Sequence, residues 1–254
     1  MPRQLALFLT AVQFLTRVPV PTLRDFQPDW TARSARYFPL VGALVGLVSG
    51  IFLIAASQVW GGVLPALLAT VAGILITGAF HEDGLADAAD GLGGGQTPGR
   101  RLEIMKDSRV GTYGVLALGL AVALKVAALA QTPVPLVLAA LVAAHAGGRG
   151  VAVLAMRLLS YAGDRASTKV KPVADGVTTE ETLIALVFVA LATVPALLLA
   201  PWATVGALAA AAVCAAVMAL LAKRLIGGWV GDTLGATEQV FEVGFLVVFV
   251  GLIA

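Results

Sequence analysis

The chain alternates long apolar runs with short segments that hold nearly all of its charged residues. A run of about 20 apolar residues is long enough to cross a hydrocarbon core of about 30 Å as a helix. Such runs lie at residues 37–59, 62–80, 111–130, 134–156, 182–200, 202–222 and 239–254. Hydrophobic residues make up 59% of the 254 residues and charged residues 13%, a balance that excludes an ordinary soluble domain. The pattern therefore predicts a polytopic integral membrane protein.

The apolar runs are rich in Leu, Ala and Val, and they do not alternate polar with apolar residues. This favours transmembrane helices over a transmembrane barrel. No repeat of about 20–50 residues and no Ser/Pro-rich linker divides the chain. We therefore predict an all-α bundle of about seven spans that forms a single integral membrane domain over residues 1–254.

The Lys and Arg residues gather in four segments that alternate with uncharged connections. The connections near residues 61–62, 131–133 and 201–202 contain no Asp, Glu, Lys or Arg. Cytoplasmic loops retain positive charge, so all four segments are predicted to face the cytoplasm. They contain Arg3, Arg17, Arg24, Arg33 and Arg36, then Arg100, Arg101, Lys106 and Arg109, then Arg157, Arg165, Lys169 and Lys171, and finally Lys223 and Arg224. We expect the chemistry of the chain on that side.

A shorter apolar stretch, residues 5–15, precedes the first span. It has the length of a signal-peptide core, but Arg17 and Pro19 follow it and no small-residue cleavage site does. Thr10, Gln13 and Arg17 recur at helical spacing, which suits a helix that lies in the plane of the lipid headgroups. We predict an uncleaved interfacial helix, with a re-entrant segment as the alternative.

The sequence HEDGLADAADG at residues 81–91 interrupts the apolar pattern most sharply. At 100° per residue, Asp83, Asp87 and Asp90 fall within about 60° of one another on a helix. Like charges this close repel one another unless a cation neutralises them, and oxygen-only ligands suit Mg²⁺ or Mn²⁺. We expect these residues at the C-terminal end of the second span, where the helix dipole also disfavours negative charge. A divalent metal site is therefore predicted.

Two further carboxylates belong to the candidate metal set. Asp232 lies among glycines on the same predicted side of the membrane, so it could complete the coordination or cap a helix. Glu82 is the other candidate ligand, although it points about 100° away from Asp83 on the same helix.

A basic segment follows a glycine run. Thr97 and Pro98 have the pattern of an N-cap and the first residue of a short helix. Arg101, Lys106 and Arg109 could hold a diphosphate, since Arg offers a bidentate fork and Lys a point charge. Ordinary anchoring at the membrane surface is the alternative for each of them.

Two cations, Lys125 and Arg149, fall inside predicted spans. An unpaired charge there costs at least about 2.5–3.5 kcal/mol, so both side chains should face the interior of the bundle. His145 lies four residues before Arg149 and shares its helix face, and together they could bind an anionic group. Pairing with Glu242 is the alternative for either cation.

The two central motifs resemble those of a known family. HEDGLADAADG at residues 81–91 and RLEIMKDSRVGTYG at 101–114 are similar to the cobalamin synthases, also called adenosylcobinamide-GDP ribazoletransferases. The resemblance includes FLTRVP at 14–19 and GDTLGA at 231–236, so it extends along essentially the whole chain. Residues 161–176 are less typical of the family, and no role is assigned to them.

The resemblance implies the last assembly step of coenzyme B12 at a bacterial inner membrane. In this reaction adenosylcobinamide-GDP joins α-ribazole or its 5′-phosphate and GMP is released, with Mg²⁺ as cofactor. The three aspartates of residues 81–91 would bind the metal, and Asp232 would be a further ligand or the base. Lys106 and Arg109 would hold the diphosphate. No nucleic acid is expected as a partner, and contact with other cobalamin-assembly enzymes or a second copy of the chain is left open.

Two other kinds of protein share some of these features. CDP-alcohol phosphotransferases also place aspartates on membrane helices, but their motif needs an Arg where this chain has Asp87. A cation-coupled transporter would also bury carboxylates and cations in a bundle. Here the carboxylates of residues 81–91 gather at one face of the membrane, which favours an enzyme.

Overall fold

A computed structural model describes residues 2–23, 26–27, 29–163 and 176–253. Within these residues no β-strand forms, and one isolated bridge joins Tyr161 to Trp229. Six helices of the described chain are long and apolar enough to cross a membrane, or up to seven spans exist if a bent helix pair counts as one. The predicted all-α bundle of about seven spans is therefore confirmed. Four of the basic residues that were predicted to face the cytoplasm lie outside the described residues: Arg24, Arg165, Lys169 and Lys171.

The bundle is built from the following helices. They are α1 (Arg3–Leu15), α2 (Trp30–Ser34), the 3-10 turn η1 (Ala35–Tyr37), α3 (Phe38–Ser57), α4 (Leu64–Thr77), α5 (Phe80–Gly94), α6 (Pro98–Met105), α7 (Thr112–Gln131), α8 (Val134–Leu158), α10 (Thr179–Leu199), α11 (Pro201–Ile226) and α12 (Gly231–Ile253).

Helix α8 lies at the centre of the bundle. It contacts α3, α10 and α12, while α12 in turn contacts α5, α7 and α11. In its most apolar stretch α8 is 78% buried, whereas α10 and α11 are 22% buried and present Leu and Val side chains outward. An outer layer of exposed apolar helices around a buried one is the arrangement expected where lipid surrounds the protein.

Small residues allow α3 to lie directly against α8. Gly42, Gly46 and Gly50 form a ridge on α3, and a methyl group at Gly42 or Gly46 would collide with the backbone of α8. Small-xxx-small patterns commonly allow membrane helices to pack this closely.

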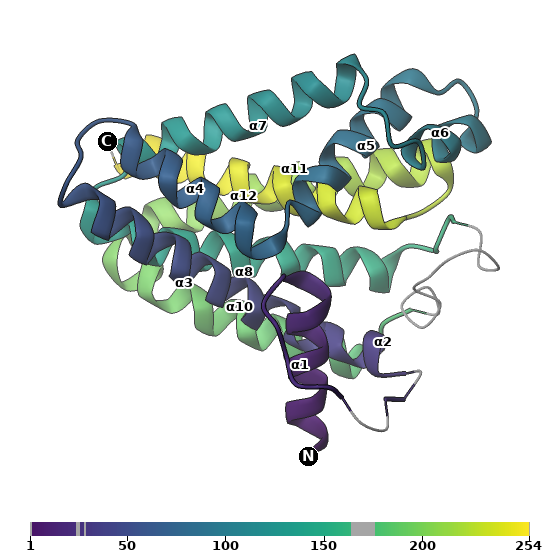
Figure 1. The fold of residues 1–254 in the computed structure, drawn as a ribbon, viewed down its shortest axis with the longest axis horizontal. Helices are drawn as coiled ribbons and strands as arrows, with labels where there is room; N and C mark the ends of the chain where they lie inside the picture. Colours follow the sequence, from purple (N-terminus) through teal and green to yellow (C-terminus); the bar gives the residue numbers. More distant parts are fainter. Residues whose placement is uncertain (1, 24–25, 28, 164–175, 254) are drawn as a thin grey trace.

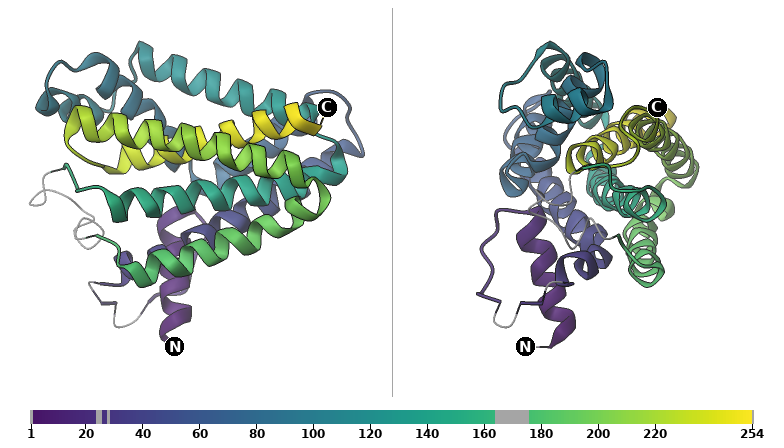
Figure 2. Two further views of the ribbon diagram at one scale, coloured as in Figure 1. Left: turned by 180° about the vertical axis from the view of Figure 1, so that it is seen from behind. Right: turned by 90° about the vertical axis from the view of Figure 1, so that its right-hand side faces the viewer.

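The two ends of the bundle differ in charge, as the positive-inside pattern predicts. The uncharged connections α3–α4, α7–α8 and α10–α11 lie at one end together with the C-terminus (Figure 1). Helices α5 and α6, the start of α12 and the end of α8 lie at the other end, as the left view of Figure 2 also shows. We call the latter the charged end.

The second predicted span is broken, which corrects one step of the sequence reasoning. Helix α4 ends at Thr77, and the two residues that follow, Gly78 (φ 68°) and Ala79 (φ 59°), have left-handed backbone conformations. Helix α5 then starts at Phe80 after a bend of 89°. Glu82 and Asp83 therefore occupy the first turn of a helix, where the dipole stabilises negative charge. The prediction that this segment is a helix C-terminus was wrong.

The last span also differs from the prediction. Helix α12 begins at Gly231 rather than near residue 239, so Asp232 lies in its first turn and two glutamates, Glu238 and Glu242, lie inside it. Sequence periodicity missed this start because glycines and charged residues interrupt the apolar run.

The N-terminal helix α1 crosses the direction of the long helices steeply (Figure 1). Leu7, Ala11 and Leu15 are buried on its inner face, and the backbone N–H of Arg17 donates to the carbonyl of Ile76 at 2.7 Å. An interfacial helix would lie at such an angle to the spans. Its position at the headgroups stays a prediction.

Candidate functional site

Aspartates from two helices meet at the charged end of the bundle. Helices α5 and α12 cross at Gly84 and Gly235, whose Cα atoms are so close that a methyl group on Gly84 would lie 3.3 Å from the Cα of Gly235. It would also lie 3.0 Å from the carbonyl oxygen of Asp232. The crossing therefore brings Asp232 beside the face of α5 that carries Asp83 and Asp87.

We call Asp83, Asp87 and Asp232 the carboxylate cluster. Asp83 is exposed, while Asp87 and Asp232 are half-buried. The negative charges of Asp83 and Asp87 act on Asp232, and that of Asp83 also acts on Asp87. Three carboxylates that repel one another, two of them partly desolvated, form a site that favours a cation. The structure thus brings Asp83 and Asp87, two members of the predicted stripe on α5, together with Asp232 of α12.

Asp90 makes a different set of contacts. It is 7% exposed, and its two carboxylate oxygens accept hydrogen bonds from the backbone N–H groups of Gly111 (2.7 Å) and Gly114 (2.9 Å). These are donors at the start of α7, so Asp90 caps that helix from another part of the chain. A Cβ atom at either glycine would collide with the carboxylate. The spacing of Asp90 and the two glycines thus has a structural reason, in addition to the predicted metal role.

The basic segment lies on α6 and the loop behind it. The predicted N-cap is confirmed, because the Thr97 side chain accepts from the N–H of Arg100 at 3.3 Å. Arg101 donates to the carbonyl of Leu225 at 3.2 Å at the end of α11, and Lys106 is exposed. Arg101 is therefore held by the fold, whereas the ammonium group of Lys106 is accessible from solvent.

Arg109 forms an ion pair with its neighbour Asp107. The two lie 2.6 Å apart, and the Arg109 side chain is 87% exposed. The hydrogen bond from Arg109 lowers the pKa of the Asp107 carboxyl to about 2. At neutral pH the guanidinium thus has an exposed partner, which a more highly charged diphosphate could displace.

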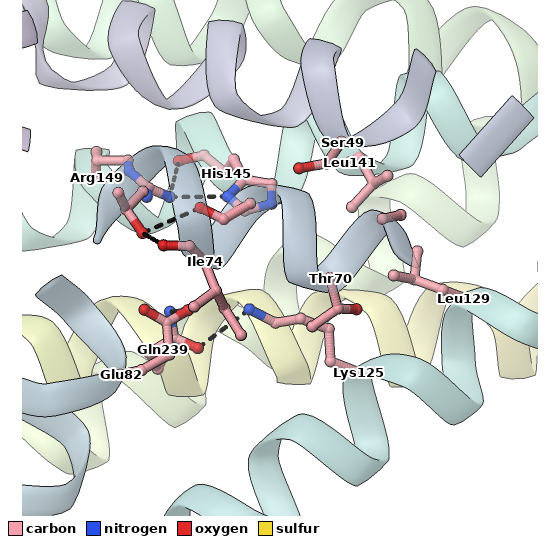
Figure 3. A pocket seen from close by; sticks show the side chains of 13 residues that line it. Ser49, Thr70, Ile74, Glu82, Lys125, Leu129, Leu141, His145, Arg149 and Gln239 are labelled. Carbon is pink, nitrogen blue, oxygen red and sulfur yellow. Dashed lines mark hydrogen bonds between the residues drawn. The ribbon is translucent and has the colours of Figure 1, made fainter. Parts of the chain in front are cut away.

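A second group of ionisable residues is buried inside the bundle. We call Glu82, Lys125, His145, Arg149, Glu238 and Glu242 the buried ion network. The Lys125 ammonium contacts Glu242 at 2.7 Å and Gln239 at 3.1 Å, and Figure 3 shows Lys125 extended from α7 toward Gln239. His145 lies 2.6 Å from Glu242, and Arg149 contacts both Glu242 and Glu238. Of the two interpretations of Lys125 and Arg149, pairing with Glu242 is the one the structure shows.

The network also contains residues that the sequence reasoning placed elsewhere or missed. Glu82 is 8% exposed and accepts from Gln239 at 3.3 Å, so it faces the interior and not the carboxylate cluster. This is the consequence of its 100° offset from Asp83. Glu238 was missed as a partner of Arg149, although its spacing of four from Glu242 inside an apolar run is a signal that could have identified it. His81 also contacts the buried ion network, since its Nδ1 lies 3.7 Å from the carboxylate of Glu238.

A small cavity lies within the network (Figure 3). It has a volume of about 20 Å³ and is lined by Glu82, Lys125, His145 and Arg149, with Ser49 and Thr70 on the opposite helices. A polar cavity of this size accommodates about one water molecule. It is too small for any part of an organic substrate.

The two clusters differ in their fitness for a metal ion. Among the described residues, His145, Glu238 and Glu242 bring three ligand atoms within 4.8 Å of one another. Lys125 and Arg149 already neutralise these carboxylates, so a divalent cation there would meet two positive charges. The carboxylate cluster offers oxygens alone, with no cation in contact among the described residues, and fits Mg²⁺ better, although its side chains must converge further to share one ion.

The chain is similar to proteins of one family along nearly its full length. A family model described as cobalamin-5-phosphate synthase matches residues 7–250. A protein of Leptothrix cholodnii named adenosylcobinamide-GDP ribazoletransferase is 46% identical over 93% of this chain and 91% of its own length. Proteins with the same name from Shewanella amazonensis and Vibrio cholerae are 41% and 39% identical over 99% and 94% of this chain and 96% and 91% of their own lengths. No solved structure matches the chain.

Proposed function

The chain belongs to the cobalamin-5-phosphate synthase family and is an adenosylcobinamide-GDP ribazoletransferase, and we propose that it performs this last step of cobalamin assembly at the carboxylate cluster with Mg²⁺. We further propose that the charged end of the bundle faces the cytoplasm of a bacterial cell, with the spans in the inner membrane. The four positively charged segments support that orientation.

The reaction exchanges one ester of phosphate for another. The 3′-hydroxyl oxygen of α-ribazole, or of its 5′-phosphate, forms a bond to the phosphorus that is attached to cobinamide. The bond from that phosphorus to the bridging oxygen of the diphosphate breaks, and GMP leaves with the bridging oxygen. The hydroxyl proton needs an acceptor, and the charge that develops on the phosphate oxygens needs neutralisation.

The residues of the carboxylate cluster divide these tasks in our proposal. Asp83 and Asp87, with Asp90 behind them on α5, would hold Mg²⁺, which when bound neutralises charge on the phosphate oxygens. Asp232 approaches from α12, on the other side of the helix crossing, and would accept the hydroxyl proton. A base on a different helix from the metal ligands can face the nucleophile while they face the diphosphate.

The basic residues near the cluster would position the donor substrate. Lys106 has an exposed ammonium group, and Arg109 can exchange its exposed partner Asp107 for a phosphate. His145 and Arg149 take part through the buried ion network rather than by contact with the diphosphate, because the His145 ring and the Arg149 guanidinium already contact Glu242 inside the bundle.

The observation that carries this proposal is the crossing of α5 and α12 at Gly84 and Gly235, which brings the HEDGLADAADG and GDTLGA motifs into one site. Those motifs are 140 residues or more apart in the sequence, and the family match includes both. A CDP-alcohol phosphotransferase or a transporter has no comparable support.

The test uses the full chain purified in detergent. Incubation with adenosylcobinamide-GDP, α-ribazole 5′-phosphate and Mg²⁺ should give GMP and a cobamide, and EDTA should abolish both. Asp232→Asn, which removes the proposed base, should lower kcat by about 10²-fold or more, the range for loss of a general base. Asp87→Asn, which removes a proposed metal ligand, should lower kcat as well. Normal activity in both variants would disprove the proposed site. Full activity in EDTA would disprove the need for a metal.

A matched control keeps the charge change but moves it away from the cluster. Glu103 on α6 is exposed and pairs with Arg100 at 3.0 Å, so Glu103→Gln removes a carboxylate at the same end of the bundle. Its activity should stay within twofold of the unsubstituted protein.

A further inference from the structure

An aromatic pocket opens beside the carboxylate cluster. It has a volume of about 200 Å³ and lies between α1, α3, α5, α8 and α12. Five of the side chains that line it are aromatic. They are Phe14, Phe38, Phe80, Tyr161 and Trp229. None of the predicted site residues except Arg149 lines this pocket, and the mechanism proposed above does not use it.

The aromatic rings of the pocket are held by one another. Phe14 stacks on Phe38 with ring centroids 5.6 Å apart and meets Phe80 edge-on at 5.5 Å. Tyr161 and Trp229 form a second edge-on pair at 4.9 Å. Rings with fixed orientation lose little side-chain entropy when a flat ligand packs on them.

Trp229 is fixed by the backbone as well. Its indole N–H donates to the carbonyl of Leu159 at 3.2 Å, and its backbone N–H donates to the carbonyl of Ser160 at 2.9 Å. These bonds connect the end of α8 to the start of α12, next to the turn that carries Asp232.

The pocket and the carboxylate cluster share two helix faces. At 100° per residue, Phe80 lies within about 60° of Asp83 and Asp87 on α5, and Gly235 lies about 60° from Asp232 on α12. Phe80 and Gly235 line the pocket. The carboxylates therefore begin about one helical turn beyond the pocket wall, roughly the distance that a ribose would span between a base and its reactive hydroxyl.

The chemistry of the lining selects the kind of ligand. Apart from the Tyr161 hydroxyl, the polar side-chain groups among the lining residues belong to His81, Arg149 and Trp229. His81 and Arg149 are engaged with the buried ion network, and the indole N–H of Trp229 donates to the carbonyl of Leu159. A guanine base would leave its amide and amino groups without partners there, and an unpaired buried polar group costs about 1–3 kcal/mol. An apolar bicyclic base meets no such penalty. An apolar cavity of about 150 Å³ is large enough to bind benzene, so the pocket has room for a fused two-ring system.

We propose that this pocket binds the planar, methyl-substituted benzimidazole of the acceptor nucleoside α-ribazole and so directs its ribose toward the carboxylate cluster. The inference rests on the proposed function for the identity of the acceptor. It adds a specificity site for the base, built by the N-terminal helix and the start of α12.

Two matched phenylalanine variants test this site. Phe14→Ala removes one wall of the pocket, whereas Phe52→Ala removes a 53% exposed side chain from the outer face of α3. The KM for α-ribazole 5′-phosphate should rise about 5- to 150-fold in Phe14→Ala, the range for loss of one aromatic stacking partner. The KM for adenosylcobinamide-GDP should stay unchanged within twofold. Phe52→Ala should change neither. An unchanged acceptor KM in Phe14→Ala, or an equal rise in both KM values, would overturn the proposal.

Filling the pocket is an independent perturbation of the same site. Ala152 lines the pocket from α8, and Ala152→Phe should raise the acceptor KM in the same way although it adds bulk rather than removing it. Size-exclusion profiles and melting curves in detergent show whether each variant is folded, and the comparison uses whichever of the two pocket variants passes.

Direct binding separates failure of this proposal from failure of the proposed function. A protein with Trp30, Trp60 and Trp202 replaced by Phe keeps Trp229 as its single tryptophan. Quenching of its fluorescence by α-ribazole, and not by GMP, would support the pocket even if no product formed in the activity assay. Quenching by GMP alone, or by neither compound, would overturn the assignment of the pocket while leaving the reaction at the carboxylate cluster intact.

Discussion

The contact between Lys125 and Glu242 provides the sharpest test of the buried ion network. Replacing Lys125 with Met removes the charge and leaves an unbranched side chain that is one atom shorter. Lys125 is 5% exposed, and its ammonium group has Glu242 at 2.7 Å and Gln239 at 3.1 Å as partners. The substitution therefore leaves two buried acceptors without their donor.

The expected cost follows from the charges that remain. The network has three carboxylates and two permanent cations, so the loss of Lys125 leaves Arg149 alone against Glu82, Glu238 and Glu242. Breaking a buried pair from one side costs about 3–5 kcal/mol. For a chain of this size each kcal/mol lowers the melting temperature by about 2–4 °C, so a drop of roughly 6–20 °C is expected.

A double-mutant cycle shows whether the cost comes from this pair. Glu242→Gln alone should also destabilise the protein, because Arg149 and His145 lose a partner as well. If the pair is coupled, Lys125→Met with Glu242→Gln is less destabilised than the sum of the two single changes, by about 1–3 kcal/mol. Lys223→Met, at an exposed lysine near the end of α11, is the control and should shift the melting temperature by less than about 2 °C.

Melting temperatures would be measured by tryptophan fluorescence in one detergent at one protein concentration. Two results would refute the reasoning. One is a Lys125→Met protein that melts with the control, which would mean that the ammonium group is not desolvated. The other is strict additivity in the cycle, which would mean that the two side chains do not interact.

Three further predictions concern the site and the helices around it. Gly84→Ala should lower activity at least tenfold, because the added methyl group forces α5 away from α12. Gly119→Ala, which has open space around it, should leave activity unchanged. Equal activities of the two variants would show that the reaction does not need the close crossing of α5 and α12. Arg109→Gln should raise the KM for adenosylcobinamide-GDP about tenfold more than Arg100→Gln, which removes another exposed arginine, on α6. A rise confined to the KM for the acceptor would contradict the assigned role. Asp90→Asn should lower the melting temperature by several degrees, because the amide oxygen can replace only one of the two carboxylate oxygens that accept from Gly111 and Gly114. The other backbone N–H is then buried without a partner, which costs about 1–3 kcal/mol. An unchanged melting curve with lost activity would indicate a purely catalytic role.

The pH dependence of the Asp107–Arg109 pair follows from the pKa of Asp107, which is lowered to about 2. A carboxyl with a depressed pKa stabilises the folded state above its ordinary pKa and loses that contribution as the pH falls toward 2. Between pH 5 and pH 9 the pair should therefore stay ionised and contribute no pH dependence to substrate binding. A change in the KM for the donor across that range that disappears in Asp107→Asn would contradict this.

Several features of the candidate site could be predicted from periodicity alone. Asp83 and Asp87 were expected on one helix face, and Glu82 was expected to diverge from them by 100°; the structure has both features. Thr97 was identified as an N-cap from its type and its position before Pro98. These predictions succeed because helix geometry is local and depends on residues only a few positions apart.

Other features depended on contacts that sequence spacing does not reveal. The bend at Gly78 and Ala79 turns a predicted helix end into a helix start, because packing of α5 against α12 replaces continuation of the span. Asp90 is of a residue type that binds metal ions, but it also caps α7. Spacing could not reveal this, because the backbone donors to Asp90 lie more than 20 residues further along the chain.

The sequence by itself determined that this chain spans a membrane, which segments gather at one end, and to which family it belongs. Apolar run length, the placement of Lys and Arg and the long acidic and glycine motifs are properties of contiguous residues, so they can be read without the fold. Only the tertiary structure decided that Asp232 joins Asp83 and Asp87, that Lys125 and Arg149 pair with Glu242, and that Phe14 and Trp229 line one pocket. Each of these sets joins residues more than 90 positions apart, and their proximity depends on which helices pack together, a choice made by the whole bundle rather than by any segment.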